Sequence, residues 1–147
     1  MSEVFEMTDE GDLSDYLGVN IDRKEDGSIE MTQPHLIDQL VEDVNFTSAT
    51  GTKPTPALSS KTLQRDEELP DHKATWGYRS VIGKLNFLLQ STRPELAVSV
   101  HQCARFSVSP KITHTDAVHH VIKYLLGSRD KGLVFKPDLT KSFEVYC

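Results

Sequence analysis

Apolar and polar residues alternate along residues 15–23 and again along residues 28–32. This period of two is typical of a β-strand with one face buried. Between the two runs, residues 24–27 have a composition typical of a tight turn, and Gly27 can adopt the positive φ that such a turn requires. The pattern predicts a β-hairpin over residues 15–32.

The period then changes to that of an α-helix. Apolar residues from Leu36 to Val44 fall on one helical face. We expect Thr32 to cap the N-terminus of this helix and Pro34 to lie in its first turn, where the missing N–H costs little. Asn45 is expected to end it.

Residues 47–73 are rich in Thr, Ser, Pro and charged side chains and show no period, which predicts a linker or an extended surface segment. Three further apolar stripes predict helices over residues 78–89, 96–106 and 113–126. Short runs of strand-forming residues follow at 133–135 and 143–146.

Capping signals accompany these helices. Thr92 and Glu95 have the spacing of a capping box, and Thr113 and Asp116 repeat that logic one helix later. Gly127 suits the C′ position after the last helix.

The predicted fold class is therefore α+β, with an N-terminal β-hairpin, a bundle of about four helices and a C-terminal pair of β-strands. The last predicted strand reaches Cys147, the final residue, without a partner for its backbone groups. We therefore expect the sequence to stop within a domain.

Charge is distributed unevenly over the 147 residues. The net charge is −6, but residues 1–72 hold 17 acidic and 5 basic side chains, whereas residues 73–147 hold 5 acidic and 11 basic ones. Such asymmetry indicates two functionally different halves, although chance drift in a short chain is an alternative.

The composition also bounds the class of protein. The chain has no run near the roughly 18 apolar residues of a transmembrane helix. Its acidic N-terminus is unlike a secretory signal, and its two cysteines do not indicate a disulfide framework. We expect an intracellular protein, cytoplasmic or nuclear, with no membrane partner.

The sequence shows no complete catalytic motif. His114, His119 and His120 are close in sequence, but His114 and His119 do not share a helical face, so solvated helix histidines are the expectation. Cys103 lies on an apolar stripe and is expected to be a buried structural thiol. The sequence predicts no catalytic residue, no metal ligand and no cofactor in this chain.

What remains is binding chemistry. Cations lie on or beside the amphipathic helices, and rigid helices that carry cations can track a phosphate backbone. These cations are Lys84, Arg93, Arg105, Lys111, Lys123, Arg129 and Lys131. The alternative is that they only coat the polar face of a helical bundle.

Three strings carry a resemblance to a known family. YRS at 78–80, GKLNFL at 83–88 and TRPELA at 92–97 resemble a block of copia-type LTR-retrotransposon polyproteins. Other matches occur in the same order along almost the whole chain. They include FEMTD at 5–9, YLGV at 16–19, MTQ at 31–33, KPTP at 53–56, RF at 105–106 and KYLLGS at 123–128.

The resemblance implies the C-terminal part of the reverse transcriptase, up to the first strand of the ribonuclease H domain. Residues 1–32 would form a palm-edge hairpin resembling the primer grip. Residues 33–128, with the linker at 47–73, would form a helical thumb-like region. Residues 129–147 would form a connection and the first strand of a truncated ribonuclease H-like domain.

The family's enzyme is an RNA-directed DNA polymerase with ribonuclease H activity and uses Mg²⁺. Both sets of its catalytic aspartates would lie outside this chain, which is therefore expected to be inactive alone. The expected partners are an RNA–DNA or DNA duplex, bound weakly and without sequence preference, and the palm and ribonuclease H segments of the parent polyprotein.

The resemblance and the cation pattern together give a set of candidate nucleic-acid-binding residues. They are Tyr16, Leu17, Gly18, Gln33, Arg79, Lys84, Arg93, Arg105 and Lys123. The alternative hypothesis is a domesticated or degenerate helical module that binds protein and has no nucleic-acid role.

Overall fold

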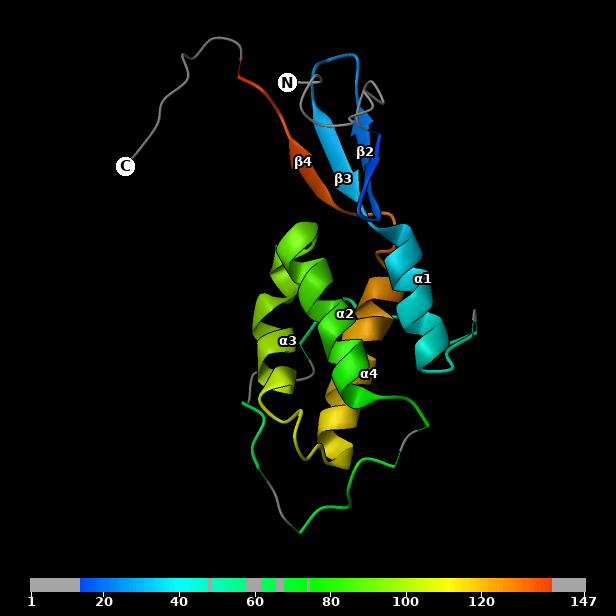
Figure 1. Ribbon diagram of the computed structural model, residues 1–147, viewed down its shortest axis with the longest axis vertical. Coiled ribbons are helices and arrows are strands. Elements are labelled where there is room, and N and C mark those ends of the chain that lie inside the picture. The colour runs from blue at the N-terminus through cyan, green and yellow to red at the C-terminus, as the bar shows by residue number, and fades with distance from the viewer. Residues whose placement is uncertain (1–13, 48, 58–61, 66–67, 74, 139–147) are drawn as a thin grey trace, which may run out of the picture.

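A four-stranded sheet stands at one end of a bundle of helices (Figure 1). This computed structural model describes residues 14–47, 49–57, 62–65, 68–73 and 75–138. The strands are β1 (Asp15–Tyr16), β2 (Val19–Arg23), β3 (Ile29–Thr32) and β4 (Leu133–Phe135). The helices are α1 (Pro34–Asp43), α2 (Tyr78–Ser91), the 3₁₀ turn η1 (Pro94–Leu96), α3 (Ala97–Ala104) and α4 (Ile112–Leu126).

The predicted α+β fold class is confirmed. Within the described part of the chain, no helix has the length and apolar character needed to cross a membrane.

The predicted hairpin is formed by β2 and β3, which pair antiparallel with Ile21 opposite Met31. Gly27 has a φ of +80° in the connecting turn, as expected. The Asp26 carboxylate fixes that turn, because it accepts hydrogen bonds from both the backbone N–H and the hydroxyl of Ser28, at 2.9 and 2.6 Å.

The prediction of one unbroken strand over residues 15–23 is wrong. The chain reverses at Leu17 and Gly18, whose φ values are +52° and +77°, and Tyr16 pairs with Val19 across this tip. Positive φ at both central residues is the signature of a two-residue hairpin turn. Apolar and polar residues keep alternating through this turn, so the sequence pattern does not show that the chain reverses direction there.

The C-terminal segment returns to the same sheet. β4 pairs antiparallel with β3, with Phe135 opposite Ile29, which makes the strand order β1-β2-β3-β4. The strand predicted at residues 133–135 is thus confirmed. The strand predicted at 143–146 and the family match at 5–9 lie outside the described residues.

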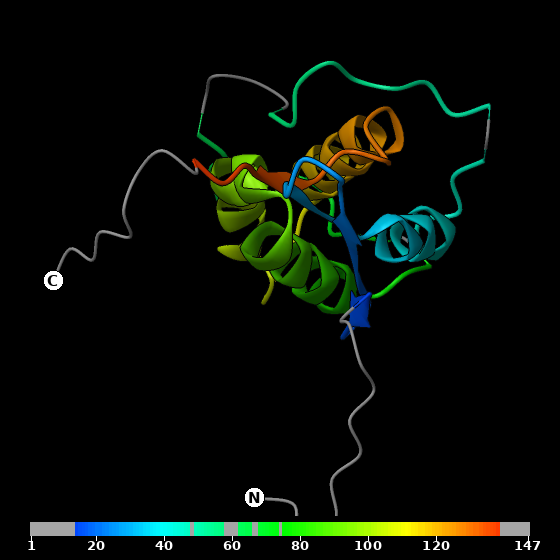
Figure 2. The same cartoon turned by 90° about the horizontal axis from the view of Figure 1, so that it is seen from above.

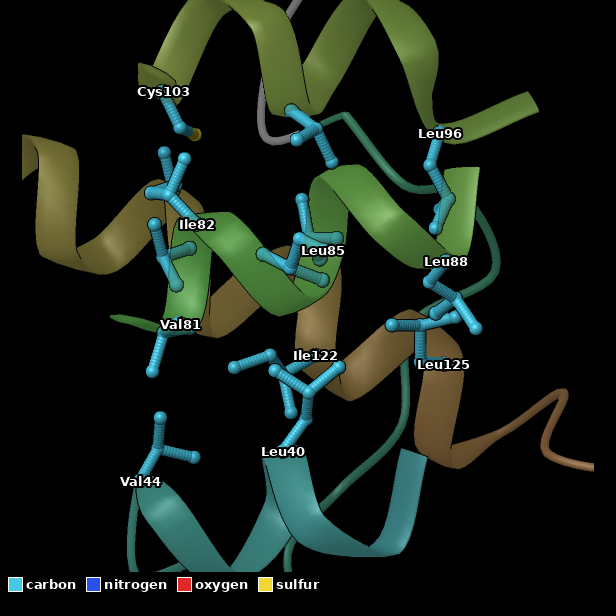
Figure 3. Packing of buried hydrophobic residues seen from close by; sticks show 14 of the residues in the cluster. Leu40, Val44, Val81, Ile82, Leu85, Leu88, Leu96, Cys103, Ile122 and Leu125 are labelled. Atoms are coloured by element: carbon cyan, nitrogen blue, oxygen red, sulfur yellow. The ribbon is translucent and has the colours of Figure 1, made fainter. Parts of the chain in front are cut away.

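The core of the molecule lies between the helices. All four α-helices contribute to one cluster of buried apolar side chains (Figure 3). Leu40, Leu85, Leu88 and Leu125 are fully buried at its centre, and they come from α1, α2 and α4. These positions belong to the predicted apolar stripes, so the helical period identified the buried face of these helices correctly.

Two helices begin at a different residue from the one predicted. Gln33 precedes α1 in place of Thr32, because Thr32 is occupied by pairing within the sheet. Lys111 precedes α4 in place of Thr113, and the backbone N–H of Lys111 donates to Nδ1 of His114 at 2.9 Å. The His114 imidazole therefore accepts the hydrogen bond that had been predicted for the Asp116 carboxylate.

The capping box predicted at Thr92 is also wrong. Thr92 ends α2, and its hydroxyl donates to Oε1 of Gln33 at 2.9 Å. Glu95 instead accepts a hydrogen bond from Nε of Arg93 at 2.7 Å. Thr92 therefore makes a tertiary hydrogen bond to Gln33, and it does not cap the N-terminus of a helix as the local spacing had predicted.

The described residues of the predicted linker at 47–73 form no helix or strand. Figure 2 shows that these described residues lie on the outer side of the helices. Gly127 contacts this linker and is the C-cap residue of α4, with a φ of −78°, whereas the sequence predicted it at the C′ position that follows the C-cap. A Cβ on Gly127 would lie 2.9 Å from Cβ of Thr52, so close packing favours glycine there.

Candidate nucleic-acid interface

The hairpin tip presents apolar side chains to solvent. Tyr16 is 59% exposed and Leu17 is 70% exposed. A positive φ costs a residue other than glycine about 1–2 kcal/mol, so Leu17 holds its exposed side chain in a strained conformation. Gly18 adopts its positive φ without that cost. Strain of this kind is concentrated at functional sites, which makes the tip a candidate contact point.

Arg93 lies in the interior, with 2% of its surface exposed. Its guanidinium donates to the backbone oxygen of Ser128 at 2.9 Å and to the Ser128 hydroxyl at 2.7 Å. It also lies 5.5 Å from the centre of the Tyr124 ring. These contacts join the end of α2 to the end of α4 and direct the cation away from solvent.

Gln33 is similarly buried, at 1% exposure. Its Oε1 accepts the Thr92 hydroxyl, whereas its Nε2 has no hydrogen-bond partner among the described residues. Gln33 joins β3 to α1, so this contact fixes the sheet against the bundle. The buried positions of Gln33 and Arg93 favour a structural role.

Arg79 and Arg105 lie together at one end of the bundle. Both side chains are exposed, and Nε of Arg79 donates to the backbone oxygen of Ser107 at 2.9 Å, two residues beyond Arg105. The Arg105 guanidinium lies 5.6 Å from the centre of the Phe106 ring. The fold therefore brings these two candidate residues to the same surface.

Two other cations are partly neutralised by carboxylates. Nζ of Lys84 lies 2.7 Å from the Asp43 carboxylate. Nε of Arg129 lies 2.6 Å from the Asp38 carboxylate, and hydrogen bonds from this guanidinium lower the pKa of Asp38. Both pairs tie α1 to the rest of the bundle.

Lys123 belongs to a third group of cations. Its Nζ lies 5.4 Å from the centre of the Phe46 ring, and its backbone oxygen accepts the N–H of Lys53 at 3.3 Å. One turn earlier, Nε2 of His120 lies 3.1 Å from the backbone oxygen of Thr55. Sequence reasoning missed Lys53 and His120 as members of this group, because a contact between an irregular linker and a distant helix leaves no periodic signal.

The expectation of solvated histidines is wrong for His114, which is completely buried. Its ring stacks on Phe106 at 3.9 Å, and its Nε2 lies 3.0 Å from the backbone oxygen of Gln64. His119 packs between Phe46 and Trp76, with ring centres 5.0 and 5.5 Å away. Within the described ranges, no three His, Cys, Asp or Glu side chains are grouped to hold a metal ion.

Cys103 is the buried thiol that the sequence predicted, at 1% exposure. Burial raises its pKa to about 12, so the thiol stays protonated at neutral pH. The Tyr78 hydroxyl donates to the backbone oxygen of Cys103 at 3.0 Å.

The chain is similar to retrotransposon proteins of yeast and plants. Over 147 residues the chain is 26% identical to transposon Ty5-1 protein YCL074W of Saccharomyces cerevisiae, covering 100% of the chain and 47% of the relative. It is 27% identical over 146 residues to the retrovirus-related Pol polyprotein from transposon RE2 of Arabidopsis thaliana, covering 99% of the chain and 10% of the polyprotein. It is also 30% identical over 143 residues to the retrovirus-related Pol polyprotein from transposon TNT 1-94 of Nicotiana tabacum, covering 92% of the chain and 10% of that polyprotein.

The chain is therefore homologous to a region of the Pol polyproteins of Ty5/copia-type retrotransposons. It spans about half the length of the yeast relative and about a tenth of the plant polyproteins. No family model matches the chain. No solved structure matches it either.

Proposed function

We propose that this chain grips a template-primer duplex, without reading its sequence, as the primer-grip and thumb region of a retrotransposon RNA-directed DNA polymerase. It contributes no catalytic site of its own. The observation that carries the proposal is the hairpin tip, where Leu17 is 70% exposed at a φ of +52°. Homology to retrotransposon Pol polyproteins over 99% of the chain supports it.

The second support is the position of the cations. Arg79 and Arg105 are exposed on α2 and beside α3, which are held rigidly by the shared core. Phosphate contacts from such groups position a duplex without carrying sequence information. Gripping of this kind aids catalysis by placing the primer end, even though the grip forms and breaks no bonds.

The proposed protein partners are the palm and ribonuclease H segments of the parent polyprotein. Val134 and Phe135 on β4 are 52% and 53% exposed, and Tyr16 on β1 is also exposed. Apolar side chains on a sheet are stabilised when another layer covers them. Mg²⁺ would be held by those neighbouring segments and not by this chain.

Fluorescence anisotropy with two labelled RNA–DNA hybrids of unrelated sequence tests the grip. At about 50 mM salt we expect both hybrids to bind with dissociation constants of roughly 10 µM, and we expect binding to weaken steeply as salt rises. No binding at this salt concentration would overturn the proposal, as would a strong preference for one sequence.

Variants locate the contact. Arg79→Gln combined with Arg105→Gln should weaken binding to both hybrids and reduce the salt dependence by about two phosphate contacts. Lys24→Gln is the matched control for each single arginine change, since it also removes one cation, but one already paired with Asp22 and Glu30. An equal loss from the control would show that only net charge matters.

The alternative, a helical module that binds protein, is favoured by the same exposed apolar tip at Leu17. It predicts that neither hybrid binds and that a pull-down recovers a protein partner. Leu17→Asp should abolish that recovery. The protein-binding alternative would be contradicted if the hybrids bound and Leu17→Asp left every protein contact unchanged.

A further inference from the structure

Part of the linker is attached along the outer side of α4. Thr52 packs against Gly127, the N–H of Lys53 donates to the backbone oxygen of Lys123 at 3.3 Å, and the backbone oxygen of Thr55 lies 3.1 Å from Nε2 of His120. His120 and Lys123 on α4 and Gly127 at its C-cap are separated by three and four residues, which is one helical turn each. Residues 52–55 therefore follow the helix for about two turns.

Three basic residues lie along this attachment. Lys53 is exposed, and His120 and Lys123 are half-buried beside it. Burial lowers the pKa of His120, and repulsion from Lys53 and Lys123 lowers it further, although the bond to Thr55 opposes the change. Asp116 is the acidic residue one turn away on α4, and its charge acts on the neighbouring His119.

The tautomer of His120 follows from its partner. A backbone oxygen can only accept a hydrogen bond, so Nε2 must carry the proton that it donates to Thr55. The neutral ring then has an unprotonated Nδ1. A further proton can be added at Nδ1 without breaking the bond to Thr55.

We infer that Lys53, His120 and Lys123 form a phosphate-binding cluster on α4 that takes up a proton when it binds. The inference deepens the proposed function and rests on it for the identity of the ligand, the phosphate backbone of a nucleic acid. A bound phosphate neutralises the repulsion from the two lysines and favours the imidazolium form. By linkage, protonation of His120 then strengthens binding, so affinity rises as pH falls.

Tripolyphosphate tests the cluster without nucleic acid. The titration of the His120 ring is followed by NMR in the full chain, with and without tripolyphosphate. We expect the titration midpoint to rise by about one pH unit when the anion is bound. His35 on α1 is the internal control and should shift much less. Lys53→Gln combined with Lys123→Gln should abolish the rise, while an otherwise unchanged spectrum shows that this variant is folded.

Two results of this titration would overturn the inference. One is a His120 midpoint that tripolyphosphate leaves unchanged. The other is a rise that persists in the double lysine variant or is equally large for His35, which would indicate a general effect of the anion.

The RNA–DNA hybrid separates this inference from the proposed function. Between about pH 7.5 and pH 6, uptake of one proton should strengthen binding by roughly three- to tenfold, and His120→Gln should remove this gain. Binding with no pH-dependent gain would overturn the inference and leave the proposed function standing. If the hybrid binds at neither pH, the proposed function fails, and the tripolyphosphate titration decides whether the cluster binds phosphate.

Discussion

The guanidinium of Arg93 and the hydroxyl of Ser128 lie 2.7 Å apart in the interior of the molecule. Arg93 follows α2 and Ser128 follows α4, and the chain enters β4 a few residues beyond Ser128. Gln33 and Thr92 are joined beside this pair, where β3 leads into α1. The orientation of the sheet relative to the bundle therefore depends on a few buried polar contacts.

Arg93→Lys tests that junction. An ammonium group lacks the planar fork that reaches both oxygen atoms of Ser128, so at least one buried acceptor would lose its partner. We expect the free energy of unfolding, measured by urea denaturation, to fall by about 2 kcal/mol. Glu95→Gln removes the half-exposed partner of the same guanidinium and should cost less than about 1 kcal/mol. Equal losses for the two variants would contradict this account.

Leu17→Asn tests the strain at the hairpin tip. The change creates the Asn-Gly pair that two-residue hairpin turns favour, and asparagine tolerates a positive φ far better than leucine. We expect the variant to be more stable by about 1 kcal/mol in urea. If Leu17 contacts the duplex, the same variant should bind the RNA–DNA hybrid more weakly. A less stable variant would show that the tip is not strained.

Leu88→Ala tests the helical core. Leu88 is completely buried, so truncation should cost about 2–5 kcal/mol of unfolding free energy. Phe87→Ala on the same helix is the control, because Phe87 is 42% exposed and should cost clearly less. A comparable loss from both would mean that α2 faces the core differently.

The buried thiol of Cys103 gives a prediction for alkaline pH. Its pKa is raised by burial to about 12, whereas an unfolded cysteine ionises near 8.5. The stability that it contributes is fully present below about pH 8.5 and is lost progressively as pH rises towards the folded value. In a Cys147→Ser background, alkylation by iodoacetamide at pH 8 should be slow in the native protein and fast in urea. Rapid alkylation of the native protein would contradict the burial.

Local periodicity determined much of this fold. The alternation over β2 and β3 predicted the hairpin, and the apolar stripes predicted all four helices. These signals work because burial of one face imposes a repeat of two or 3.6 residues on a segment, whatever it packs against. Resemblance to retrotransposon polyproteins was also readable from short strings, and it agrees with the homology over the whole chain.

The helix ends and the candidate site depended on contacts between distant segments. Thr92 has the spacing of a helix cap, yet its hydroxyl donates a hydrogen bond to Gln33. Arg93 was expected among the surface cations, yet it is buried against Ser128. A polar side chain goes wherever its hydrogen bonds are satisfied, and its neighbours along the chain do not specify that place.

The sequence by itself therefore determined the elements, their buried faces and the relationship to retrotransposons. Only the tertiary structure decided which cations stay on the surface, as Arg79 and Arg105 do, and which are buried like Arg93. It also decided that Lys53 lies beside His120 and Lys123. The physical reason is that apolar burial follows a period along one segment, whereas the environment of a charge is set by whatever other segment packs against it.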